Sequence, residues 1–189
     1  LPNPSLSQPV YEFCREIKNI LILIGSGDKF DLIPQIIKAL DSIQQPIHLR
    51  VITDKKGLKQ SIHQIDVLPF QAEINEHYDW ADFCITSGGL AKYEAAYLGK
   101  PSAVISLTES EQIETEHFAQ ADLCFDFGLV NNFEEIVFAK KLNNILNNIA
   151  IRKQAFKACQ NHFYINSSDK TAQFVLDCFH LRKTTEVKL

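Results

Sequence analysis

Two glycine-rich segments of this chain have the residue types that hold a phosphate group. The first is Gly25-Ser26-Gly27-Asp28 and the second is Ser87-Gly88-Gly89. Glycine lets a backbone come close to an anion because no Cβ stands in the way, and the free N–H groups at the start of a helix attract negative charge. Both segments are therefore candidates for anion binding, provided that each leads from a strand into a helix.

The first segment leaves two interpretations open. It lacks the G-x-G-x-x-G pattern of dinucleotide-binding loops, because Asp28-Lys29-Phe30 follows Gly27. It is either a plain turn in which Asp28 or Asp31 caps the next helix, or a contact for phosphate or sugar.

Glu94, which follows Gly89 by five residues, is a further candidate ligand-binding residue near the second segment. A helix that begins at Leu90 places Glu94 about one turn inside it. A diphosphate at the helix start brings a ribose within reach, and a carboxylate can accept hydrogen bonds from both vicinal ribose hydroxyls. The alternative is that Glu94 is an ordinary solvated helix residue.

Alternating strand and helix patterns supply the scaffold for these segments. Apolar runs typical of buried parallel strands occur at 19–24, 48–53, 66–70, 83–86, 102–107 and 123–127. Helical patterns occur at 32–43, 55–63, 73–80, 90–98, 111–121, 133–147, 149–162 and 171–181. This alternation predicts an α/β fold: a Rossmann-like three-layer domain with a six-stranded parallel sheet and extra C-terminal helices. In the usual Rossmann strand order the two glycine-rich segments are neighbours, since they follow the first and fourth strands.

Composition and charge disfavour several classes of protein. The formal net charge of −4 argues against general nucleic-acid binding, which needs a positive field. No apolar run reaches the roughly 18–20 residues that span a bilayer, and no signal peptide is evident. Five cysteines without a CxxC pair indicate a reduced, cytoplasmic protein. Six histidines without HExxH spacing or a companion carboxylate or thiol cluster predict no metal site.

The start of the chain bears on its domain organisation. The chain contains no Met and begins Leu1-Pro2-Asn3-Pro4. Because an open reading frame normally starts with Met, we expect a piece of a longer protein or a processed one. Residues 1–18 are expected to form a linker or arm, 19–181 the Rossmann-like domain and 182–189 a tail.

One long string carries a family resemblance. The string from Ile85 to Ser102, with its Ser87-Gly88-Gly89, Glu94 and Gly99-Lys100-Pro101, resembles the C-terminal half of GT-B nucleotide-sugar enzymes. It is most similar to the family of the UDP-sugar hydrolase PseG and the spore-coat polysaccharide protein SpsG, and more distantly to MurG-type glycosyltransferases. The resemblance implies that the glycine pair cradles a diphosphate, that Glu94 binds the ribose, and that Gln112 meets the phosphate or sugar.

The chain departs from this family just before Gln112. The family has an Asn-Gln pair where this chain has Glu111-Gln112, which places a carboxylate near the anionic ligand. The nucleotide-sugar site that the resemblance implies consists of Gly25, Ser26, Gly27, Asp28, Ser87, Gly88, Gly89, Glu94, Glu111 and Gln112.

The resemblance also implies a function. We expect the UDP-sugar-binding C-terminal half of a nucleotide-sugar hydrolase in surface polysaccharide or nonulosonic acid biosynthesis. The alternatives are the donor-binding half of a GT-B glycosyltransferase and a non-catalytic nucleotide-sugar-binding module. The expected partners are a UDP-sugar and a missing N-terminal Rossmann-like half that supplies a histidine base, so the isolated domain is expected to be inactive. No cofactor is predicted.

Overall fold

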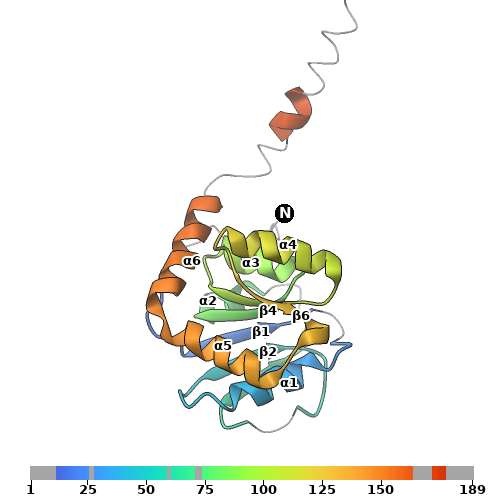
Figure 1. Cartoon of the computed structure of the whole chain (residues 1–189), viewed down its shortest axis with the longest axis vertical. Coiled ribbons are helices and arrows are strands. Elements are labelled where there is room, and N and C mark those ends of the chain that lie inside the picture. The colour runs from blue at the N-terminus through green and yellow to red at the C-terminus, as the bar shows by residue number, and fades with distance from the viewer. Residues whose placement is uncertain (1–11, 26–27, 59–60, 71–73, 164–171, 178–189) are drawn as a thin grey trace, which may run out of the picture.

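The chain forms one parallel sheet covered by helices on both faces (Figure 1). The computed structural model describes residues 12–25, 28–58, 61–70, 74–163 and 172–177. The strands are β1 (Asn19–Leu23), β2 (His48–Ile52), β3 (Gln64–Leu68), β4 (Phe83–Ser87), β5 (Ser102–Ser106) and β6 (Phe125–Leu129). The helices are α1 (Leu32–Leu40), α2 (Asn75–Trp80), α3 (Leu90–Tyr97), α4 (Glu109–Gln120), α5 (Glu135–Asn147) and α6 (Ile149–His162), with a 3-10 turn, η1, at Val130–Asn132. Residues 172–177 are also helical.

The strand order explains why β1 is apolar on both faces. The six strands are all parallel and follow the order β3-β2-β1-β4-β5-β6, so β1 lies inside the sheet. Ile20 and Ile22 face a core shared with α1 and α5, whereas Leu21 and Leu23 face a second core shared with α2 and α3. The predicted Rossmann-like α/β class with a six-stranded parallel sheet is confirmed.

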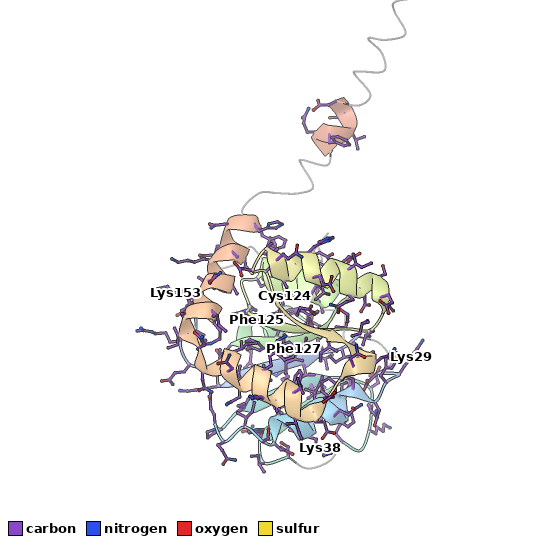
Figure 2. The ribbon with its side chains drawn as sticks, in the orientation of Figure 1. Lys29, Lys38, Cys124, Phe125, Phe127 and Lys153 are labelled. Atoms are coloured by element: carbon purple, nitrogen blue, oxygen red, sulfur yellow. The ribbon has the colours of Figure 1, made fainter. Side chains whose placement is uncertain are left out.

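The helices form one layer on each side of the sheet. Figure 1 shows α1 and α5 side by side, and these two helices are in contact. Phe125 and Phe127 of β6 (labelled in Figure 2) extend this layer's core, since Phe125 stacks on Phe83 and Phe127 packs against Phe138. On the other side, α3 and α4 lie next to each other and are joined by Glu114, which accepts hydrogen bonds from Lys92 and Tyr93.

Three local predictions need correction. The helix expected at 55–63 is wrong, because the described residues of this range form a loop in which Gly57 has a φ of +76°. The third strand begins two residues earlier than predicted and ends at Leu68, before Pro69, which has no N–H to donate to a neighbouring strand. The sixth strand begins two residues later, because a turn through Asp122, with a φ of +59°, follows α4.

A buried arginine fastens the segment that leads into β1. Arg152 of α6 is only 1% exposed, and its Nη1 and Nη2 donate to the carbonyl oxygens of Cys14 and Arg15 at 2.9 and 2.7 Å. Just beyond, Asp82 accepts hydrogen bonds from the backbone N–H groups of Lys18 and Asn19. Residues 12–18 of the predicted arm are thus tied to α6 and to the residue before β4, while residues 1–11 and the tail at 182–189 lie outside the described residues.

Two further findings concern membrane-spanning helices and the state of the buried cysteines. None of the helices in the part of the chain that the structure describes is long and apolar enough to cross a bilayer. The buried cysteines Cys84, Cys124 and Cys159 are free thiols, and burial raises the pKa of each to about 12. They pack as small apolar side chains.

Candidate functional site

The two glycine-rich loops meet at the carboxyl edge of the sheet. β1 and β4 are adjacent, with Leu23 opposite Thr86. A Cβ placed on Gly25 would lie 3.9 Å from the Ser87 Oγ, and one placed on Gly89 would lie 3.6 Å from the same oxygen. The predicted proximity of the loops is therefore confirmed for Gly25, whereas Ser26 and Gly27 lie outside the described residues.

The two loops differ in what they offer an anion. Asp28 has a side chain only 3% exposed, and its two carboxylate oxygens accept hydrogen bonds from the N–H groups of Leu32 and Ile33 at 2.6 and 2.9 Å. Asp28 therefore caps α1, which is one of its two predicted roles, and it occupies the donors at that helix start. In contrast, Gly89 precedes α3 without any side-chain cap hydrogen bond. Among the described residues of the two loops, the N–H groups at the start of α3 remain available to a ligand oxygen.

Glu94 lies one turn inside α3 and is held by a tyrosine from another helix. The Tyr78 hydroxyl donates to Glu94 Oε2 at 3.0 Å, and Tyr78 itself is fully buried under α3. Burial raises the pKa of the half-buried Glu94 above its ordinary value, and the Tyr78 hydrogen bond opposes that rise. A carboxylate fixed in this way is not an ordinary solvated helix residue.

Tyr78 is the site residue that the sequence did not reveal. It precedes Glu94 by sixteen residues and lies on a different helix. No periodicity or local spacing connects two such positions. Only the packing of α2 against α3 brings the hydroxyl to the carboxylate.

Glu111 lies directly against Gly88. Thr108 caps α4 by accepting a hydrogen bond from the Glu111 N–H, so Glu111 is in the first turn of the helix. Its Oε2 accepts a hydrogen bond of 2.7 Å from the Leu107 N–H at the end of β5. A Cβ placed on Gly88 would lie 2.8 Å from the Glu111 Cβ and 3.0 Å from Oε2. The loop after β5 thus closes over the loop after β4.

Gln112 is directed toward β6. Its Nε2 donates to Asp126 Oδ2 at 2.9 Å and to Glu116 Oε1 at 3.1 Å. Its Oε1 is buried and has no hydrogen-bond partner among the described residues. The amide nitrogen is therefore engaged within the protein, and the free group is the acceptor oxygen, which suits a sugar hydroxyl better than a phosphate.

Other features of the surface lie away from this corner. A hollow of about 690 Å³ is lined by Asn19, His48, His63 and Arg152, at the opposite edge where the strands begin. Within the described ranges, no group of three or more His, Cys, Asp or Glu side chains is arranged to hold a metal ion.

Comparisons with known proteins bear on the sequence relationship and on the fold. No protein-family model matches the chain. The spore coat polysaccharide biosynthesis protein SpsG of Bacillus subtilis (strain 168) is 25% identical over 163 residues, which cover 78% of this chain and 46% of SpsG. The sequence relationship to the SpsG side of the predicted family is thereby confirmed.

Solved structures agree on the fold. The chain superposes on MurG of Acinetobacter baumannii with a TM-score of 0.70 and 18% identity, covering 87% of this chain and 51% of MurG. It also matches the glycosyltransferase SsfS6 of Streptomyces sp. SF2575, a complex with thymidine diphosphate, with a TM-score of 0.56 and 12% identity, covering 85% of this chain and 43% of SsfS6. The chain spans about half the length of the proteins it matches.

Proposed function

We propose that this chain, which has the fold of one half of the GT-B nucleotide-sugar enzymes, binds the nucleotide of a UDP-sugar at the start of α3. The observation that carries the proposal is the pairing of an uncapped helix start at Gly89 with a fixed carboxylate, Glu94, one turn further on. An anion at the helix start and a ribose at the carboxylate use both features at once.

The same geometry suggests what this half contributes to a reaction. A diphosphate that leaves a sugar gains negative charge, and preorganised backbone N–H groups stabilise that charge. We propose that Gly88 and Gly89 let the diphosphate approach these donors, that Glu94 orients the ribose, and that Gln112 accepts from a sugar hydroxyl. The groups that act on the anomeric carbon, including a histidine base, then come from a second Rossmann-like half.

Two reactions use such a donor site. The similarity to SpsG, a spore coat polysaccharide biosynthesis protein, supports a role in surface polysaccharide biosynthesis. Within that role we propose a UDP-sugar hydrolase, with nonulosonic acid biosynthesis as a second setting for the same reaction. The glycosyltransferase folds of MurG and SsfS6 support the donor-binding half of a transferase. Both proposals predict the same nucleotide contacts in this chain and differ only in what attacks the sugar.

Titration calorimetry with UDP tests the proposed site. We expect the folded chain to bind UDP, and Glu94→Gln to weaken binding about tenfold, because a neutral amide replaces a charge-assisted acceptor. Glu16→Gln is the matched control, since Glu16 is an exposed residue that precedes β1 at the other edge of the sheet. A folded chain that does not bind millimolar UDP would contradict the proposal.

The binding of UDP should also depend on pH through Glu94. Because burial raises the pKa of this carboxyl, the charged acceptor is lost at a higher pH than for an ordinary glutamate, and affinity falls as the pH is lowered from about 7 toward about 5. Tyr78→Phe removes the hydrogen bond that favours the ionised form, so the loss should begin at a still higher pH. The terminal phosphate of UDP also titrates, at about pH 6, and contributes to the same pH dependence.

Glu94→Gln separates these two titrations. This variant keeps the titration of the UDP phosphate but lacks that of Glu94. Subtracting its pH profile of UDP affinity from the profiles of the wild type and of Tyr78→Phe therefore leaves the contribution of Glu94. If the subtracted profiles of the wild type and Tyr78→Phe coincide, Tyr78 does not control the ionisation of Glu94.

A further inference from the structure

A carboxylate occupies the space beside Gly88 that an anionic ligand would need. The Glu111 Oε2 lies 3.0 Å from the position of a Cβ on Gly88, and the Glu111 Cβ lies 2.8 Å from the same point. The Ser106 Oγ, which donates to Thr115 Oγ1, is 3.2 Å from it. The open side of Gly88 is thus covered by Glu111 and the end of β5.

The carboxylate also occupies a backbone donor. The Leu107 N–H donates to Glu111 Oε2 at 2.7 Å, the length of a charge-assisted hydrogen bond. Leu107 directly follows β5, the neighbour of β4 in the sheet, so this N–H belongs to the same carboxyl edge as Gly88. In the free chain the acceptor for this donor is a side chain of the protein itself.

We propose that Glu111 is a built-in competitor for the phosphate of the ligand, an inference that rests on the proposed function. Glu111 fills the corner in the free chain, and a phosphate enters only when this side chain turns away and releases the Leu107 N–H. Before it turns, two negative charges meet beside Gly88, which weakens binding of phosphorylated ligands. Glu111 therefore sets the affinity of the corner for phosphate and has no effect on the nucleoside part.

Charge removal at Glu111 tests this competition. Glu111→Gln keeps an acceptor oxygen for the Leu107 N–H and removes the charge, so calorimetry should give about tenfold tighter binding of UDP. Glu109→Gln is the matched control, because Glu109 is an exposed acid in the same first turn of α4, and its UDP affinity should stay within about twofold of the wild type. Uridine, which has no phosphate, should bind both variants and the wild type equally.

Ionic strength gives a second readout that a purely structural effect would not move. The ratio of the Glu111→Gln affinity to the wild-type affinity for UDP should shrink as salt rises from about 0.05 M to about 0.5 M, because salt screens the repulsion between the two charges. A constant ratio would overturn the role of the charge.

The outcomes separate this inference from the proposed function. Binding of UDP by the wild type with equal or weaker binding by Glu111→Gln overturns the competition and leaves the nucleotide site standing. Tighter binding of uridine as well as UDP by Glu111→Gln also overturns it, since the effect would not be directed at phosphate. Failure of both the wild type and Glu111→Gln to bind UDP overturns both proposals.

Discussion

Replacing Gly88 with alanine should lower the free energy of unfolding by about 2 kcal/mol, whereas the same change at Gly89 should leave it within about 0.5 kcal/mol. The Cβ added at Gly88 would lie 2.8 Å from the Glu111 Cβ, an atom next to the main chain that cannot rotate away. The Cβ added at Gly89 would lie 3.6 Å from the Ser87 Oγ, which is ordinary contact. Neither glycine has a positive φ, so backbone strain does not contribute to the difference.

Urea denaturation of the two variants measures this contrast. Glu111→Gly removes the obstructing Cβ, so in that background Gly88→Ala should cost clearly less than in the wild type. Equal unfolding free energies for Gly88→Ala and Gly89→Ala would show that the loop after β5 does not close over Gly88. Both alanine variants should bind UDP more weakly than the wild type, since each adds a methyl group where the phosphate is proposed to approach.

The second large effect is expected at Arg152. Replacing it with methionine keeps most of the buried volume but removes both donors to Cys14 and Arg15, and should lower the free energy of unfolding by about 3 kcal/mol. Lys153→Met is the matched control on the same helix, because Lys153 is exposed and points away from the domain in Figure 2. Its effect should stay within about 0.5 kcal/mol.

Hydrogen exchange locates the loss caused by Arg152→Met. Exchange of the backbone amides at residues 12–18 should accelerate in this variant more than exchange in β4 or β5, because only the lead-in segment loses its anchor. A variant as stable as Lys153→Met would contradict the anchoring role. Uniformly faster exchange would instead point to a general loss of packing around α6.

The sheet and the position of its ligand-binding edge were predictable from the sequence because they depend on local patterns. Apolar runs such as residues 19–24 indicate strands buried on both faces, and the glycines at 25 and 88 mark strand ends. With a parallel sheet and its usual order, the meeting of these two loops follows without further information. The helix expected at 55–63 failed because Gly57 requires a left-handed backbone conformation, which outweighs a weak helical pattern.

The contacts that define the corner depend on partners distant in sequence and could not be predicted. The role of Asp28 was left open between cap and ligand contact, and only the positions of the Leu32 and Ile33 N–H groups decide for the cap. Glu94 needs Tyr78 from another helix, and Arg152 is a helix arginine whose complete burial no spacing indicates. Gln112 was expected at the ligand, yet its amide nitrogen is engaged by Asp126 of β6.

The anchoring of the lead-in segment also constrains the order in which the protein can fold. Arg152 and Cys14 are separated by 138 residues, and Asp82 joins Lys18 across 64 residues. The segment before β1 therefore cannot be secured until Arg152 has been synthesised, 138 residues after Cys14, which takes on the order of ten seconds. The apolar strand β1 lacks its β4 neighbour during the first part of that interval, and the segment before it lacks its tether to α6 throughout. Such non-local closure predicts slow folding, with β1 exposed to aggregation until the closure forms.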